Sequence, residues 1–114
     1  MELVSLTFIK VAETSEIPLG QMKVVRLAEK EVLITNINNV YYAIENSCTH
    51  MHGDLSKGNL EGNTLTCPKH KANFDVTTGK VVCGPKIPLI HPKIKDESTY
   101  AVKVEGKDIL LESQ

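Results

Sequence analysis

Two short motifs contain the residues of this chain best suited to bind a metal. Cys48 and His50 form a C-x-H motif, Cys67 and His70 form a C-x-x-H motif, and sixteen residues separate the two. Thiolates and imidazoles are the ligands that zinc, copper and iron–sulfur centres prefer in proteins. The four side chains therefore predict one metal centre held between two loops.

Two kinds of centre accept two cysteines and two histidines. A structural zinc ion takes Cys₂His₂ sets, but such sites usually begin with two cysteines spaced C-x₂₋₄-C. A 2Fe–2S cluster with mixed ligation places two cysteines on one iron and two histidines on the other. Each motif here would then supply one ligand to each iron. The order Cys-His, Cys-His favours the 2Fe–2S cluster and predicts one-electron transfer. A structural zinc site is the alternative.

Length and composition predict one small domain with an aliphatic core. The chain has 114 residues, three tyrosines, two phenylalanines and no tryptophan. A net charge of −1 gives no polyelectrolyte character that would favour nucleic acid. Three cysteines, two of them in the motifs, argue against a disulfide framework and favour a reducing compartment, so we expect a cytoplasmic protein. We see no secretory signal and no apolar run long enough to span a membrane, and expect a soluble protein.

The elements that must position the motifs are short strands. Asn38-Asn39, Gly62-Asn63, Thr78-Gly79 and Gly106 are turn signals between them, and helix is scarce, with at most a turn at Ser56–Glu61. The expected strands lie at residues 8–11, 23–29, 31–37, 40–45, 64–66, 80–83, 100–105 and 108–111. Strands at this spacing predict an all-β fold, an antiparallel β-sandwich or barrel.

Both motifs directly follow predicted strands. Cys48 comes after the strand at 40–45, and Cys67 comes after the strand at 64–66. Loop tips suit a cluster because their backbone N–H groups are not used in a sheet ladder and can point at sulfur. A third segment, Gly84–Pro88, is stiff and apolar enough to cover such a site.

The stretch from Cys48 to Pro88 resembles the Rieske ferredoxin family. It contains C-x-H, Leu55-Ser56-Lys57-Gly58, C-P-x-H, Phe74-Asp75, Thr78-Gly79 and Gly84-Pro85. The resemblance implies one Rieske-type 2Fe–2S cluster, with Cys48 and Cys67 on the buried iron and His50 and His70 on the outer iron. It also implies a single Rieske domain with a base at 1–46 and 89–114 and a cluster-binding subdomain at about 47–88.

The chain departs from the high-potential respiratory branch of that family. That branch joins its two ligand loops by a disulfide, and the corresponding positions here are Gly53 and Lys69. It also places a serine and a tyrosine near the cluster, where this chain has Ala72 and Phe74. Fewer donors to the sulfurs stabilise the reduced cluster less, so we expect a potential in the lower part of the Rieske range.

Charge is unevenly spread. Residues 48–88 contain five lysines against three acidic residues, a local net charge of +2, and the rest of the chain carries −3. Lys69 and Lys71 flank His70. We hypothesise that the cluster tip docks on acidic partner surfaces, with ordinary solvated lysines as the alternative.

Four further residues have structural interpretations. We expect Cys83 to be a small buried thiol on a strand, and His52 and His91 to face solvent. Asp75 is expected to tie the second loop to the backbone.

Two classes of function remain. The favoured one is a monomeric one-electron carrier that passes electrons from a reductase to an oxygenase or other redox enzyme and binds neither nucleic acid nor membrane. It is not itself an enzyme, because the motifs lack a nucleophile–base pair, a phosphate loop or paired carboxylates. The other is a metal-stabilised, Rieske-like or zinc-binding, regulatory or structural subunit of a larger reductase. A weaker third reading makes the cluster a sensor of redox state.

Overall fold

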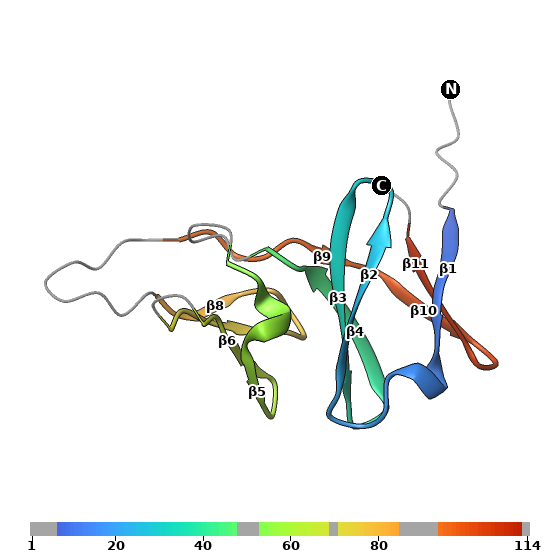
Figure 1. The fold of residues 1–114 in the computed structure, drawn as a ribbon, viewed down its shortest axis with the longest axis horizontal. Coiled ribbons are helices and arrows are strands. Elements are labelled where there is room, and N and C mark those ends of the chain that lie inside the picture. Colours follow the sequence, from blue (N-terminus) through green and yellow to red (C-terminus); the bar gives the residue numbers. More distant parts are fainter. Residues whose placement is uncertain (1–6, 48–52, 69–70, 85–93, 113–114) are drawn as a thin grey trace, which may run out of the picture.

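The computed structural model describes residues 7–47, 53–68, 71–84 and 94–112. Within these ranges the chain forms eleven strands and two short 3₁₀ helices, arranged in three antiparallel sheets (Figure 1). The predicted all-β, antiparallel class is confirmed. No helix in these ranges has the length and apolar character needed to cross a bilayer.

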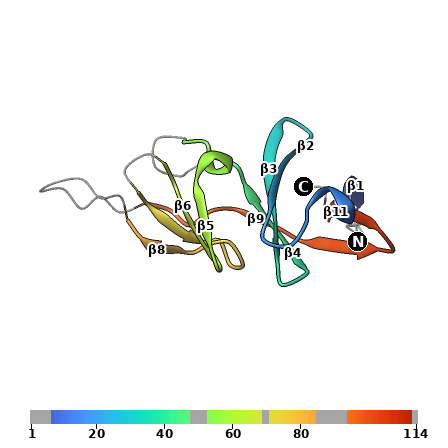
Figure 2. The same cartoon turned by 60° about the horizontal axis from the view of Figure 1, so that its bottom comes forward.

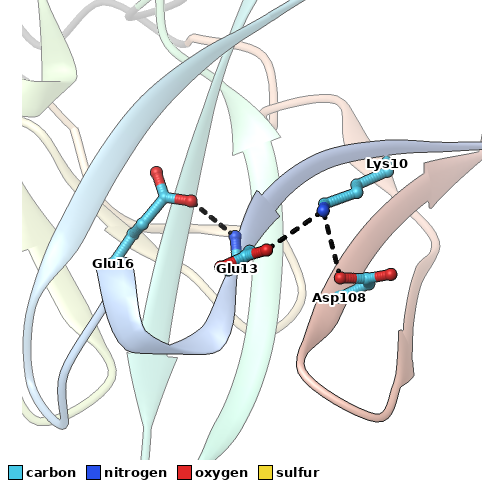
Figure 3. Close-up of polar contacts among 4 residues, drawn as sticks. All are labelled: Lys10, Glu13, Glu16 and Asp108. Atoms are coloured by element: carbon cyan, nitrogen blue, oxygen red, sulfur yellow. Dashed lines mark hydrogen bonds and ion pairs between the residues drawn. The ribbon is translucent and has the colours of Figure 1, made fainter.

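The first sheet joins the two ends of the described chain. Its order is β1 (Phe8–Glu13), β11 (Asp108–Glu112) and β10 (Val102–Glu105). A bulge between Lys10 and Ala12 interrupts the β1–β11 register. Next to it, Lys10 Nζ lies 3.1 Å from Glu13 and 3.2 Å from Asp108, and the Glu13 N–H donates to Glu16 of η1 (Thr14–Glu16) at 2.7 Å (Figure 3). These contacts fix the turn that leads from the first sheet to the second.

The second sheet lies in the middle of the molecule. Its order is β2 (Met22–Leu27), β3 (Lys30–Ile37), β4 (Val40–Glu45) and β9 (Thr99–Tyr100). Five consecutive residues of β3, Val32–Asn36, are buried. A strand buried on both faces loses the alternation of apolar and polar residues, which explains the consecutive apolar residues Val32, Leu33 and Ile34.

The third sheet is built from strands of only three residues. Its order is β5 (Asn59–Glu61), β6 (Thr64–Thr66), β7 (Asn73–Asp75) and β8 (Val81–Cys83). The short helix η2 (Leu55–Lys57) precedes it. The turn expected at Ser56–Glu61 is therefore wrong in part, because that segment contains the end of η2 and the whole of β5.

Two apolar cores lie on opposite faces of the central sheet. On one side Val32 and Ile34 pack with Ile109 and Leu111 of the first sheet. On the other side Leu33 packs among the side chains of η2 and the third sheet. Both views show β2, β3 and β4 between the β1–β11–β10 sheet and the β5–β8 sheet (Figures 1 and 2). Neighbouring residues of one strand thus support two different halves of the molecule.

Candidate metal centre

Cys67 is the member of the predicted ligand set that the structure describes. It follows β6 directly, its side chain is fully buried, and it belongs to the same core as Leu65, Ala72 and Phe74. Its backbone N–H donates to the Ala72 carbonyl oxygen at 2.7 Å. This bond closes the loop between β6 and β7, so the thiol sits at a fixed point at the base of the second motif.

The other three predicted ligands, Cys48, His50 and His70, lie outside the described residues. The same is true of His52, His91 and residues 85–88 of the expected covering loop. The structure does describe the residues on both sides of the first motif. Ser47 and Asp54 form an isolated antiparallel bridge, which closes the loop that carries Cys48 and His50.

A network around Asn46 reinforces this closure. Asn46 is 4% exposed, and its Nδ2 donates to Asp54 Oδ1 at 2.9 Å. Its Oδ1 accepts from the Ser56 N–H at 2.9 Å, and its backbone N–H donates to the Glu31 carbonyl oxygen at 2.9 Å. We call Asn46, Asp54, Ser56 and Glu31 the Asn46 network. It connects the two sides of the first motif with the start of β3.

Asp54 also caps η2. Its Oδ1 accepts from the Ser56 hydroxyl at 2.6 Å and from the Ser56 N–H at 3.0 Å. The Ser56 hydroxyl, followed by the Asn46 amide and the Ser56 N–H, holds the pKa of Asp54 below its ordinary value despite partial desolvation. Hydrogen bonds to the ionised form favour that form, so Asp54 is a carboxylate at neutral pH.

Gly58 lets the two loops come together. A Cβ at this position would fall on the Thr66 carbonyl oxygen, one residue before Cys67, and would lie 3.1 Å from the Leu55 carbonyl oxygen. Leu55 of η2 is fully buried in the core that contains Cys67. The chain leaving the first motif is therefore packed directly against the strand that enters the second.

The surroundings of Cys67 suit a metal-bound thiolate. A thiolate buried among apolar side chains is costly unless a cation or hydrogen-bond donors compensate its charge. Ala72 and Phe74, which are both fully buried, bring no hydroxyl to this core. A cationic metal centre between two closed loops meets the requirement, and the donor set of two cysteines and two histidines fits a mixed-ligand 2Fe–2S cluster.

The structure corrects the prediction for Cys83. The thiol is exposed, not buried, although it does lie on a strand. β8 is the edge strand of its sheet, and its register with β7 shifts at Val82, so this end of the strand is turned away from the core.

Asp75 ties a loop to the backbone, but the prediction named the wrong loop. Its Oδ1 accepts from the Thr77 N–H at 2.9 Å and from the Thr77 hydroxyl at 2.6 Å. These bonds stabilise the turn between β7 and β8. They do not reach the loop that carries the second motif.

The ion pairs of the described chain are unevenly distributed. All six ion pairs in the described ranges lie between residues 10 and 45 or 103 and 108. Lys57, Lys71 and Lys80 are exposed, and no acidic group of the described chain lies within ion-pair distance of them. Lys71 has a left-handed backbone with φ 62°, next to the second motif.

Sequence reasoning missed Asn46 and Gly58. The available signal for the first was Asp54-Leu55-Ser56, an N-cap pattern that begins four residues after His50. Nothing in the sequence assigns Asn46 to that cap, because its partners come from separate segments. The requirement for glycine at 58 depends on the approach of Thr66, which only the fold creates.

Comparison with known proteins agrees with this arrangement. The Rieske [2Fe-2S] domain family matches residues 7–95. A ferredoxin component of naphthalene 1,2-dioxygenase/salicylate 5-hydroxylase systems from Ralstonia sp is 36% identical over 107 residues, covering 94% of this chain and 96% of the relative. A naphthalene 1,2-dioxygenase ferredoxin component from Pseudomonas aeruginosa is 37% identical over 97 residues, covering 85% of this chain and 86% of the relative.

Solved structures give the same result. The ferredoxin of carbazole 1,9a-dioxygenase from Nocardioides aromaticivorans superposes with a TM-score of 0.80 at 27% identity, covering 95% of this chain and 99% of that one. A chain in a complex of reduced oxygenase and oxidized ferredoxin of carbazole 1,9a-dioxygenase has a TM-score of 0.81 at 25% identity, covering 94% of both chains.

The chain belongs to the Rieske [2Fe-2S] domain family. Within that family it is a ferredoxin, a one-electron carrier with one Rieske 2Fe–2S cluster, and not a catalytic oxygenase. The predicted resemblance, cofactor and electron-transfer role are confirmed.

Proposed function

We propose that this ferredoxin is the electron-transfer component of an oxygenase system, which accepts single electrons from a reductase and delivers them to a terminal oxygenase. The observation that carries the proposal is the full-length match to ferredoxin components of dioxygenase systems, at 36% identity over 94% of this chain. The solved complex of reduced oxygenase and oxidized ferredoxin in carbazole 1,9a-dioxygenase contains a chain with the fold of this protein, which supports an oxygenase as the partner.

Our proposal for the ligands is Cys48 and Cys67 on one iron and His50 and His70 on the other. The buried position of Cys67 supports its assignment to the inner iron. When bound, the cluster supplies a one-electron redox couple. The chain contributes the closed loops and an apolar wall, formed by Leu65, Ala72 and Phe74, that excludes water from the Cys67 side.

We also propose the division into a base at 1–46 and 89–114 and a cluster-binding region at 47–88. Its support is the separation of the sheets, since β5–β8 fall entirely within 47–88 and the remaining strands fall outside. In the same proposal the potential lies low in the Rieske range, because Ala72 and Phe74 offer no hydroxyl to the sulfurs.

The partner surfaces in this proposal are acidic. Lys57, Lys71 and Lys80 are exposed and lack ion-pair partners in the described chain, so their charge is available to another molecule. We propose a monomer, since the exposed large apolar side chains of the described chain, Ile9, Leu19, Val40, Val82 and Val104, lie on separate segments. An exposed free thiol at Cys83 supports the cytoplasm as its compartment.

Low-temperature EPR after reduction with dithionite tests the proposal. Mixed histidine–cysteine ligation is expected to give a rhombic signal whose average g value lies below that of all-cysteine 2Fe–2S clusters. Sedimentation of the same sample tests the monomer. A silent spectrum together with zinc in the elemental analysis would refute the electron-transfer role and leave a structural metal domain.

A further inference from the structure

The Asn46 network lies between the end of β4 and the first ligand motif. Asn46 follows the last residue of β4, Glu45, and precedes Cys48 by two residues. A buried amide whose donor and acceptor are both satisfied rigidifies its surroundings and specifies one arrangement. Here the partners are the two sides of one loop and the start of β3, so the arrangement that is specified is that of the loop.

We infer that Asn46 is a positioning residue for the cluster: its side chain holds Asp54 and Ser56, which follow the motif of Cys48 and His50, and η2 in turn packs against the strand before Cys67. This inference rests on the proposed ligand set. Its first step is the closure of the loop, in which Nδ2 of Asn46 holds Asp54 Oδ1 at 2.9 Å across the Ser47–Asp54 bridge.

The second step transmits this closure to Cys67. Oδ1 of Asn46 holds the N–H of Ser56 in η2 at 2.9 Å. Leu55 of the same helix is buried in the core of Cys67, and Gly58 at its end lies against Thr66. A shift of Asn46 therefore moves η2, and η2 cannot move without disturbing the strand before Cys67.

The third step anchors the network to the base. The Asn46 N–H donates to the Glu31 carbonyl oxygen at 2.9 Å, and Nδ2 lies 3.3 Å from Glu31 Oε1. Glu31 is the second residue of β3, the central strand of the molecule. These two bonds attach Asn46, and with it Asp54 and Ser56, to β3. Mutation of residues that orient metal ligands without binding the metal themselves typically weakens metal affinity by about 10- to 100-fold.

The chain offers a matched control in Asn36. It is a second buried asparagine, 2% exposed, whose Nδ2 donates to the Ile17 carbonyl oxygen at 2.9 Å and whose Oδ1 accepts from the Asn39 N–H at 2.9 Å. Its partners all lie in the base. Asn36→Ala removes the same kind of side chain with similar bonds, but none of these bonds reaches a ligand loop.

The experiment compares Asn46→Ala and Asn36→Ala in the cluster-loaded protein. Iron release to a chelator, the EPR g values, the midpoint potential and thermal unfolding are measured for each. We expect Asn46→Ala to retain iron about tenfold less well and to shift both g values and potential. Asn36→Ala is expected to lower thermal stability while keeping the wild-type spectrum and potential.

A second variant covers the case in which Asn46→Ala does not fold. Asp54→Ala removes the carboxylate that accepts from Asn46 Nδ2. Because Asp54 is exposed, this change leaves no cavity in the core. It is expected to shift the g values in the same direction, whereas Asp54→Asn, which keeps an acceptor oxygen, leaves iron retention close to wild type. Wild-type g values and potential in Asn46→Ala or Asp54→Ala would overturn this inference but leave the proposed function intact. The absence of a Rieske spectrum in the unmodified protein would overturn the proposed function and this inference with it.

Discussion

In the base of this ferredoxin, basic side chains meet acidic ones at 3.0–3.9 Å, whereas Lys57, Lys71 and Lys80 of the cluster-binding region have no such contact in the described chain. Exposed ion pairs of this kind contribute little to stability. They pair basic side chains of the proposed base with acidic neighbours, whereas Lys57, Lys71 and Lys80 form no ion pair within the described residues. In the proposed docking on acidic partners, these unpaired lysines are therefore the charges available to another molecule.

The two regions also differ in how their strands are held. β2, β3 and β4 of the base have six to eight residues, but every strand of the third sheet has three. Three-residue strands offer few ladder bonds, so the third sheet depends on its buried core and on the loops that it carries. Variants that act on one region and spare the other can test this contrast.

The largest difference is expected between the two described cysteines. Cys67→Ser removes a proposed iron ligand from a buried site, so the Rieske EPR signal should be lost. Cys83→Ser changes an exposed thiol and should leave the signal and its g values unchanged. Loss of the spectrum in both variants would contradict the proposed assignment.

The next contrast lies on one strand. Leu33→Ala and Ile34→Ala should each lower the free energy of unfolding by about 2–5 kcal/mol, because both side chains are fully buried. Only Leu33 packs in the core of Cys67, so only Leu33→Ala should also accelerate iron release. Chemical denaturation and a chelator assay measure the two effects. Equal iron release from both variants would show that the two cores are not energetically separate.

A smaller effect is expected from one added methyl group. Gly58→Ala places a Cβ on the Thr66 carbonyl oxygen and should destabilise the loaded protein by about 1–3 kcal/mol while weakening iron retention. Gly106→Ala, in the base turn with φ +60° and open space around its Cβ, should cost about 1–2 kcal/mol through backbone strain alone. Unchanged iron retention in Gly58→Ala would argue against a close approach of the two loops.

Charge reversal tests the electrostatic contrast. Lys71→Glu should slow reduction of the terminal oxygenase by about three- to tenfold at low ionic strength, with the difference disappearing as salt is added. Lys103→Glu is the control, because Lys103 already pairs with Glu105 at 3.3 Å in the base. Stopped-flow rates that are equal for the two variants, or that do not depend on salt, would count against steering.

The smallest effect is a pH dependence. Hydrogen bonds from Ser56 lower the pKa of Asp54, and the ion pair with Lys23 lowers that of Glu16. A carboxyl group whose folded pKa is depressed stabilises the fold above its unfolded pKa and loses this contribution as the pH falls through the folded value. Asp54→Asn and Glu16→Gln should each flatten the fall in thermal stability between neutral and acidic pH. A slope that stays at the wild-type value would contradict the assignment for that residue.

Much of the base could be predicted because its strands are long and aliphatic. The expected segments at 31–37 and 40–45 correspond to β3 and β4 within one residue. The third sheet was harder to predict, since β5 has only three residues with a single apolar one, Leu60. Cys83 is exposed because β8 lies at the edge of its sheet and contains a bulge. Neither the edge nor the bulge is visible in a local pattern.

The candidate site divides in the same way. Its residue types and spacing are local, and they predicted the cofactor class. The assignment of Cys67 to the buried iron came from the family resemblance, and the structure does bury this side chain. Cys48, His50 and His70 stay predictions, because they lie outside the described residues. Asn46 could not be found, because its role depends on partners at positions 31, 54 and 56 that only the folded chain brings together.

The pairing of β4 with β9 has a consequence for chain entropy. Ala43 pairs with Tyr100 and Ile44 with Thr99, so the proposed cluster-binding region, residues 47–88, is inserted between two paired strands of the central sheet. When residues 47–88 are folded, the two ends of this segment already lie close together, so the pairing of β4 with β9 costs little loop-closure entropy. When it unfolds, β4 and β9 must close a long flexible loop, and the entropy of closure opposes them. Loss of the cluster should therefore loosen β9 through the connectivity of the chain, even where no contact is broken.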